Sequence, residues 1–255
     1  MDGEARVIVE RRFKTVMLLL AMAVPVAAAA QPAQPARPTY TLTVTREGTP
    51  FLTLAAQGAK LSDIAADVAR RLNVKVIVAP SLKDERVTAQ LNASPIEPAM
   101  LALAPRVYVD YEVRKDTQPV PLGIYLLGLE DPAPAVSAVV QGTSQGLLIE
   151  GNTEDTGQPR ADAPVRVTYG RGKLSVFAKQ QPLIVVVMTI ADVIGVPAEI
   201  KHPSRELVDV DVRDTPVLEE ALAGLSENVR VYVRSNANTL ERSLLRVVVV
   251  GPTPK

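Results

Sequence analysis

The stretch from Glu206 to Leu225 contains two hydrophobic periods in succession. Valines first alternate with charged residues, which is typical of a strand with one buried face. Aliphatic residues then recur at helical spacing after Asp214-Thr215-Pro216, where a capping residue precedes a proline at the first helical position. The stretch therefore predicts a strand that leads into an amphipathic helix. The strand valines are Val208, Val210 and Val212, and the apolar helix residues are Val217, Leu218, Ala221, Leu222 and Leu225.

The same two periods recur along the chain. Helical stripes predict helices over residues 61–72 and 183–194, capped at their C-terminal ends by Asn73 and Gly195. Another helix should begin at Ser94-Pro95, and Pro105 ends it. Alternation predicts strands at residues 40–45, 51–55, 74–78, 87–91, 107–113, 122–129, 165–169, 174–178, 196–200, 229–233 and 244–250. Pro197 would confine the strand over 196–200 to a sheet edge.

The order of these elements repeats within the chain. A shift of 122 residues aligns Leu61 with Leu183 and Val68 with Ile190. A repeat of this length indicates duplicated domains. We therefore expect an α+β fold with two tandem βαββα-type units, each with small mixed sheets and two helices. The units are expected at residues 39–130 and 165–251, joined by a linker over 131–164 that is rich in Pro, Gly, Ser, Thr and Asp.

At these residues the chain resembles a known family. The segments LSDIAADVARRLNVKVIV and TPVLEEALAGL are similar to the short N-terminal domain of secretins and TonB-dependent receptors. The resemblance covers roughly residues 51–113 and 173–234, and it implies a periplasmic βαββα module that docks other proteins. Pro98 stands where the second copy has Glu219, and a proline there suits only the first turn of a helix, so the length of the first copy's second helix is left open. The pore, barrel and plug domains of the larger family members have no counterpart here.

The N-terminus predicts export. Basic residues precede the apolar run Met17–Ala29, and small residues suitable for cleavage follow, so residues 1–30 are read as a signal peptide. An uncleaved anchor is the alternative. Residues 31–38, QPAQPARP, form an extended tether. The chain contains no cysteine, and its formal net charge is +0. We therefore expect a periplasmic protein, or alternatively a secreted one, with no nucleic-acid partner and no membrane insertion after signal cleavage.

No residue pattern predicts a catalytic, cofactor-binding or metal site. His202 is the only histidine, so a zinc cluster is excluded and a solvated surface position is expected. Asp209 and Asp211 share a strand face, which could pair two carboxylates for catalysis but better fits a solvent face. The remaining candidates are interpreted in the same way. They are Ser204, which lacks a nucleophile elbow; the acidic linker group Glu150, Asn152, Glu154 and Asp155; the turn Gly170-Arg171-Gly172; and the arginines Arg70, Arg71, Arg230 and Arg234, read as solvated.

The sequence therefore predicts a non-catalytic periplasmic protein–protein interaction module, an accessory or docking component of an envelope assembly such as a secretion or pilus system. The alternative is a periplasmic ligand-binding protein or envelope hydrolase with an unrecognised site. No cofactor is expected, and the oligomeric state is left open. Docking should use sheet edges or helix faces, and the strands at 40–45 and 165–169 are the expected edges.

Overall fold

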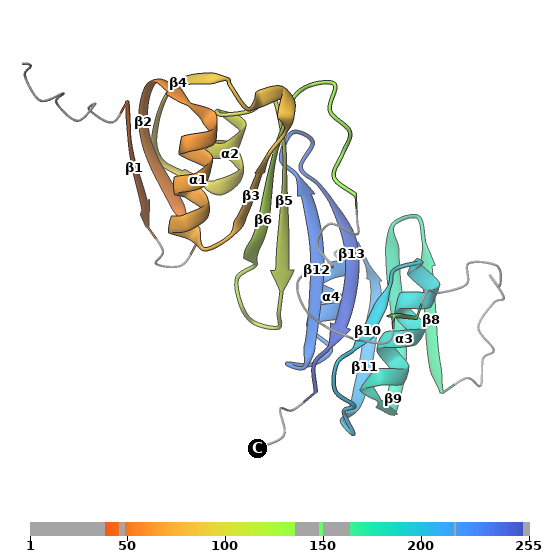
Figure 1. Ribbon diagram of the computed structural model, residues 1–255. Coiled ribbons are helices and arrows are strands. Elements are labelled where there is room, and N and C mark those ends of the chain that lie inside the picture. The colour runs from red at the N-terminus through yellow and green to blue at the C-terminus, as the bar shows by residue number, and fades with distance from the viewer. Residues whose placement is uncertain (1–38, 46–48, 136–147, 150–163, 217, 252–255) are drawn as a thin grey trace, which may run out of the picture. The chain divides into compact units, whose positions relative to one another are not determined.

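The computed structural model describes residues 39–45, 49–135, 148–149, 164–216 and 218–251 (Figure 1). The predicted signal peptide, the tether and most of the predicted linker lie outside these residues. The described part is an α+β structure, as expected, with more strand than helix and with four short α-helices. Its strands form three sheets. The small mixed sheets expected for each unit were wrong, because the two small sheets are antiparallel and the mixed sheet is a single one of seven strands.

Residues 39–130, called the first half below, contain eight strands and helices and one 3₁₀ turn. They are β1 (Tyr40–Thr45), β2 (Phe51–Lys60), α1 (Leu61–Leu72), β3 (Lys75–Val78), the 3₁₀ turn Pro80–Leu82, β4 (Arg86–Pro95), α2 (Ile96–Leu101), β5 (Arg106–Val113) and β6 (Val120–Leu127). The two-residue strand β7 (Leu148–Ile149) follows.

Residues 165–251, the second half, repeat this order of strands and α-helices. They contain β8 (Val165–Gly170), β9 (Lys173–Pro182), α3 (Leu183–Ile194), β10 (Ala198–Ile200), β11 (Leu207–Thr215), α4 (Leu218–Ala223), β12 (Val229–Asn236) and β13 (Glu241–Val249). The strand pairing repeats as well. Strands β1-β2-β4 form one small sheet, and β8-β9-β11 form the equivalent one.

The third sheet runs through both halves in the order β3-β6-β5-β12-β13-β10-β7. It is mixed, because β3–β6 and β10–β13 are parallel and the other pairs are antiparallel. The halves join where β5 and β12 pair in antiparallel fashion, with Tyr111 opposite Val233 at the centre of the repeat. Asp110 opposite Arg234 and Glu112 opposite Tyr232 therefore lie symmetrically on the two sides of this pair.

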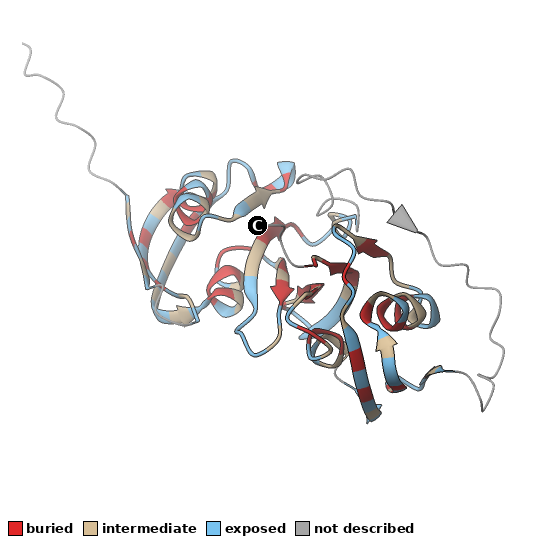
Figure 2. Ribbon diagram, turned by 90° about the horizontal axis from the view of Figure 1, so that it is seen from below, coloured by how far each residue is buried: buried red, intermediate tan, exposed pale blue. Residues whose placement is uncertain are grey.

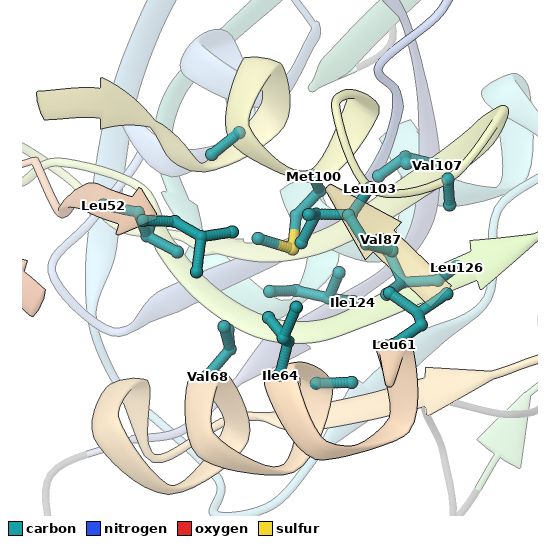
Figure 3. Close-up of a cluster of buried hydrophobic side chains, with 14 of the residues drawn as sticks. Leu52, Leu61, Ile64, Val68, Val87, Met100, Leu103, Val107, Ile124 and Leu126 are labelled. Atoms are coloured by element: carbon teal, nitrogen blue, oxygen red, sulfur yellow. The ribbon is translucent and has the colours of Figure 1, made fainter. Parts of the chain in front are cut away.

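Each half encloses an aliphatic core between its small sheet and the central sheet, with Ala237 in the first core and Val113 in the second. In the first half, Leu61, Ile64 and Val68 of α1 point towards Met100 of α2 and Ile124 of β6 (Figure 3). The second half has an equivalent cluster built from α3, α4 and the strands around them. Buried and exposed positions alternate along β2 and β9, as expected for strands with one covered face (Figure 2).

The helix caps follow the sequence prediction in two places. Asn73 and Gly195 end α1 and α3 in the left-handed conformation, with φ of 57° and 70°. The β-branched run in α3 does not prevent a helix, because Leu183, Val186 and Ile190 are fully or almost fully buried. Packing of the apolar stripe outweighs the weak local propensity.

Two local predictions were wrong. The helix start predicted at Asp214-Thr215-Pro216 lies inside and just after β11, and α4 begins only at Leu218. Asp214 has a φ of 47° at an irregularity in the β11–β9 pairing. Pro197 does not place its strand at an edge either, because β10 pairs with β13 on one side and β7 on the other. The proline precedes the strand, and only its carbonyl accepts a bond, from the Val247 N–H.

Candidate protein-binding edges

Each small sheet has one irregular edge strand and one regular edge strand. The pairings of β4 with β2 and of β11 with β9 each contain two register shifts. The pairings of β1 with β2 and of β8 with β9 contain none. Bulges and charges are the features by which proteins prevent edge strands from pairing with other chains. β11 also carries charges on its exposed face, whereas β1 has no charged residue and β8 has one, Arg166.

The backbone of β1 has a defined outward direction. The amide of Gln57 donates to the Thr39 carbonyl at 3.0 Å, so these two residues form a hydrogen-bonded pair of the β1–β2 ladder. Such pairs alternate with non-hydrogen-bonded ones in an antiparallel ladder. The N–H and C=O groups of Tyr40, Leu42 and Val44 are therefore directed away from β2, at the free edge.

The equivalent strand β8 has the same arrangement. Gly170 pairs with Lys173 across a two-residue turn in which Arg171 and Gly172 have φ of 53° and 73°. These positive values match a type I′ hairpin, whose closing pair is hydrogen-bonded. Alternation from that pair directs the backbone groups of Val165, Val167 and Tyr169 outward. Among the described residues β8 pairs only with β9, so both strands that the sequence marked as edges are confirmed as edges.

Exposed apolar side chains concentrate in the second half. Five large ones lie on β8, β9, β11 and α3, namely Tyr169, Phe177, Val185, Val193 and Leu207. The 122-residue shift places Asp63 and Arg71 of α1 at the positions of Val185 and Val193. The outer face of α1 is therefore charged, whereas the outer face of α3 is apolar with the single acid Asp192. Phe177 lies on the outer face of the small sheet, whereas Val185 and Val193 lie on the helix that covers its other face, so the five side chains are spread over two sides.

The outer face of the second small sheet is shallowly hollowed, with a volume of about 260 Å³. The guanidinium of Arg166 lies 4.6 Å from the Phe177 ring centre, in cation–π contact. Asp211 beside it accepts two bonds from Arg213 at 2.9 Å each. The equivalent face of the first half is a hollow of about 510 Å³ with Thr, Ala and Gln around Tyr40. The two faces differ in charge and would favour different ligands.

A groove of about 380 Å³ lies beside α2, near the centre of the repeat. Five of its wall residues are prolines: Pro50, Pro95, Pro98, Pro119 and Pro121. The hydroxyl of Tyr111 donates to Glu97 at 3.0 Å within it, and Arg242 of the second half reaches its rim. Burial raises the pKa of Tyr111 well above its ordinary value, and the Glu97 carboxylate adds to the rise. This tyrosine is therefore a hydrogen-bond donor at neutral pH, not a base.

A cluster of charged residues is buried at the β5–β12 junction. Arg234 of β12 donates to both carboxylate oxygens of Asp110 in β5, at 2.7 and 2.9 Å, and its guanidinium lies 5.0 Å from the Tyr125 ring centre. Related to this pair by the repeat, Tyr232 donates to Glu112 at 3.0 Å. Arg234 is only 7% exposed, so its interpretation as a solvated charge was wrong. The carbonyl of Pro134 also accepts from Arg234, and this carbonyl lies on the segment that leaves the first half.

A second charged pair extends this cluster into the second half. Arg246 lies 4.2 Å from the Tyr232 ring centre and donates to Glu199 at 3.0 Å. Its Nε is the one buried side-chain nitrogen or oxygen without a partner among the described residues. Every acid in this network is bonded by a cation or a hydroxyl, so the cluster fits a structural junction better than a reaction centre.

The sequence candidates for chemistry stay apart. His202 is exposed, as predicted, and Ser204 is buried and accepts a bond from the Glu206 amide at 3.1 Å. Asp209 accepts from the amide and side chain of Gln180 at 2.9 and 2.6 Å. Asp209 and Asp211 are both exposed, which confirms the solvent-face interpretation. Gly170-Arg171-Gly172 is the hairpin turn that was predicted, and the acidic group at 150–155 lies outside the described residues.

Sequence reasoning missed the buried pair and the groove. The 122-residue shift aligns Asp110 and Glu112 of β5 with Tyr232 and Arg234 of β12. Acids on one strand thus correspond to hydrogen-bond donors on the other, and this difference is the signal that could have indicated their pairing. In the described ranges no cluster of three or more histidine or acidic side chains could hold a metal ion. No helix there has the length and apolar character needed to cross a bilayer.

Comparisons with known proteins do not assign the fold to a family. Scans against protein-family models, curated proteins and solved structures each returned no match.

Proposed function

We propose that this chain is a non-catalytic protein-binding component of a bacterial envelope assembly, exported by residues 1–30 and acting in the periplasm. Its partner would add an extended segment to a regular sheet edge, β1 or β8. The observation that carries this proposal is the contrast between the edges of each small sheet. One edge is bulged, and the other is regular, with three residues whose backbone groups point outward.

A regular edge of this kind favours an occupant. Backbone donors and acceptors at an edge bond a neighbouring strand in the same way as they would inside a sheet. Each such bond contributes about 0.5–1.5 kcal/mol net, and alternate side chains of the added strand supply specificity. The apolar residues exposed on β9, β11 and α3 would supply further contact area around β8.

We further propose that the two halves are duplicates of one folding unit. Each half would be one copy of a single unit, as the resemblance to secretin N-terminal domains implies. The repeated element order and the equivalent pairing of the strands support this reading. Two copies would give one protein two docking edges with different neighbouring side chains.

Proline substitution at an outward-facing residue tests the docking edge. Val44→Pro in β1 and Val167→Pro in β8 each remove an outward donor without removing a donor of the existing ladder. Val44→Ala and Val167→Ala are the matched controls, because they remove the same side-chain contacts and keep the N–H. A photoreactive residue at exposed Thr43 or Thr168 would report crosslinking to a partner in cells.

We expect each proline variant to lose its own crosslink while the alanine variant keeps most of it, with circular dichroism unchanged. Equal crosslinking in both proline variants and their alanine controls would reject strand addition. Thr168→Pro removes a donor to β9, so its loss of structure checks that the assay responds to an unfolded sheet.

A second candidate function is small-ligand binding in the groove beside α2. The observation in its favour is that Glu97, Tyr111 and Arg242 place an acid, a hydroxyl and a cation around one cavity. A fragment screen by NMR would detect it: shifts at Tyr111 that vanish in Glu97→Gln favour a ligand site. A groove that stays silent while edge variants lose their crosslinks would leave docking as the function.

A further inference from the structure

We infer that the β8 edge takes β8 of a second copy of this chain, in an antiparallel pairing centred on Val167. This inference rests on the proposed strand addition and names the occupant of one of its two edges. β1 then remains for a different protein. The result is a closed two-fold dimer in which the two second-half small sheets become one continuous sheet of six strands.

The side chains of β8 fit this pairing. With Val167 opposite its own copy, Val165 lies opposite Tyr169, which combines an aliphatic and an aromatic side chain on the helix-covered face. Arg166 lies opposite Thr168 on the outer face, so no like charges lie directly opposite each other. Aromatic and β-branched cross-strand pairs stabilise sheets, and like charges destabilise them. Tyr169, which is 41% exposed, would gain a partner for its ring.

The neighbouring helix distinguishes β8 from β1. A two-fold pairing at an edge brings the helix that packs beside that edge towards its own copy, and these helices are α3 for β8 and α1 for β1. α3 presents Val185 and Val193, which are 45% and 41% exposed. α1 presents Asp63 and two arginines that pair with Asp67, so the approach of an identical helix would remove these charges from water. The electrostatics therefore favour self-pairing at β8.

Symmetry favours this pairing over one that joins β8 to β1. Two copies of β8 form an isologous contact that closes at two chains. A contact between β8 of one chain and β1 of the next leaves a free edge at each end and continues into a filament. A single discrete dimer is thus the expected product.

Charge substitution at Thr168 tests the pairing without disturbing the core, because this side chain is exposed. Thr168→Glu places an acid opposite Arg166 twice per dimer, and Thr168→Lys places a second cation there. We expect the dimer dissociation constants of the two variants to differ by about tenfold at low salt, with Glu the tighter, and the difference to shrink as salt is added. Sedimentation across a range of protein concentrations measures both constants.

The register is tested with cysteines, because the chain has none of its own. A mixture of Arg166→Cys and Thr168→Cys chains should form a disulfide between chains, since the two positions lie opposite each other in the pairing. Either variant alone should crosslink much less. Val167→Pro should weaken self-association at least tenfold relative to Val167→Ala, while Val44→Pro should leave it unchanged.

The inference would be overturned if the chain stays monomeric over a 100-fold range of protein concentration that reaches about 1 mM. Even weak complexes form at that concentration. The inference would also be overturned if Val167→Pro leaves self-association unchanged, or if the cysteine pairs that crosslink indicate a different register. Neither result touches the proposed function, which is tested separately by partner crosslinking at β1 and its loss in Val44→Pro.

Discussion

Asp110 of β5 and Arg234 of β12 form a buried bidentate ion pair that joins the two halves, with N–O distances of 2.7 and 2.9 Å. Removing one member leaves a buried charge without its counterpart. We expect Asp110→Ala to lower the free energy of unfolding by about 3–5 kcal/mol, measured by urea denaturation. The double variant Asp110→Leu, Arg234→Met should recover most of this loss. Additive losses in the double variant would show that the two residues do not act as a pair.

Cleavage within residues 131–164 should leave the halves bound to each other. Strands β5 and β12 pair over six residue positions, and the Asp110–Arg234 ion pair crosses the same junction, which is called the seam below. Insertion of a specific protease site near residue 145, followed by gel filtration, should therefore give one peak that contains both fragments. The same cut in Asp110→Ala should release fragments at lower urea concentration. Two separate peaks from the otherwise unchanged chain would contradict a strong seam.

Tyrosine ionisation should destabilise the fold at high pH. Burial, with a smaller contribution from the Glu112 carboxylate, raises the pKa of Tyr232 to about 12. The tyrosine of the unfolded chain ionises near pH 10, so its contribution is fully present below pH 10 and is lost as the pH rises to about 12. The loss amounts to at most about 1.4 kcal/mol per pH unit for this group. Between pH 10 and 12, the unfolding temperature of the Tyr232→Phe variant should fall less steeply with pH than that of the unchanged protein, as measured by thermal unfolding.

The apolar face of α3 should tolerate the residues of α1. Val185→Asp together with Val193→Arg introduces the side chains found at the equivalent positions of α1. Because both valines are exposed, stability should change by no more than about 0.5 kcal/mol per site. Binding of an apolar dye and self-association through β8 should both decrease. Unchanged dye binding would show that the exposed patch lies elsewhere.

Much of the local structure could be predicted from hydrophobic periodicity. α1 and α3 have the bounds 61–72 and 183–194 that their stripes and C-terminal caps predict. Strand ends were less predictable. β2 and β4 extend to ten residues because bulges let them continue past Gly58 and Ala93, which have positive φ. Periodicity does not reveal such bulges, since the alternation breaks where they occur.

The assembly of the sheets could not be derived from the sequence. Alternating valines identify the core face of β5 and β12 but not the neighbour of each strand. Arg234 on the opposite face of β12 was expected to be solvated, yet it is buried together with Asp110 of β5 because the two residues neutralise each other. Asp214 is a residue type that commonly caps helices, but here it lies at an irregularity of β11 that only the pairing with β9 defines.

The β5–β12 seam has a consequence for how the molecule can specialise. A pair of identical subunits must present every surface twice, and it comes apart when it is diluted. Here the two sides of the seam belong to one polypeptide, so the seam forms with the same strength in a single molecule as in a concentrated solution. Each side is also free to change alone, which is how a charged outer helix can sit on one side and an apolar one on the other.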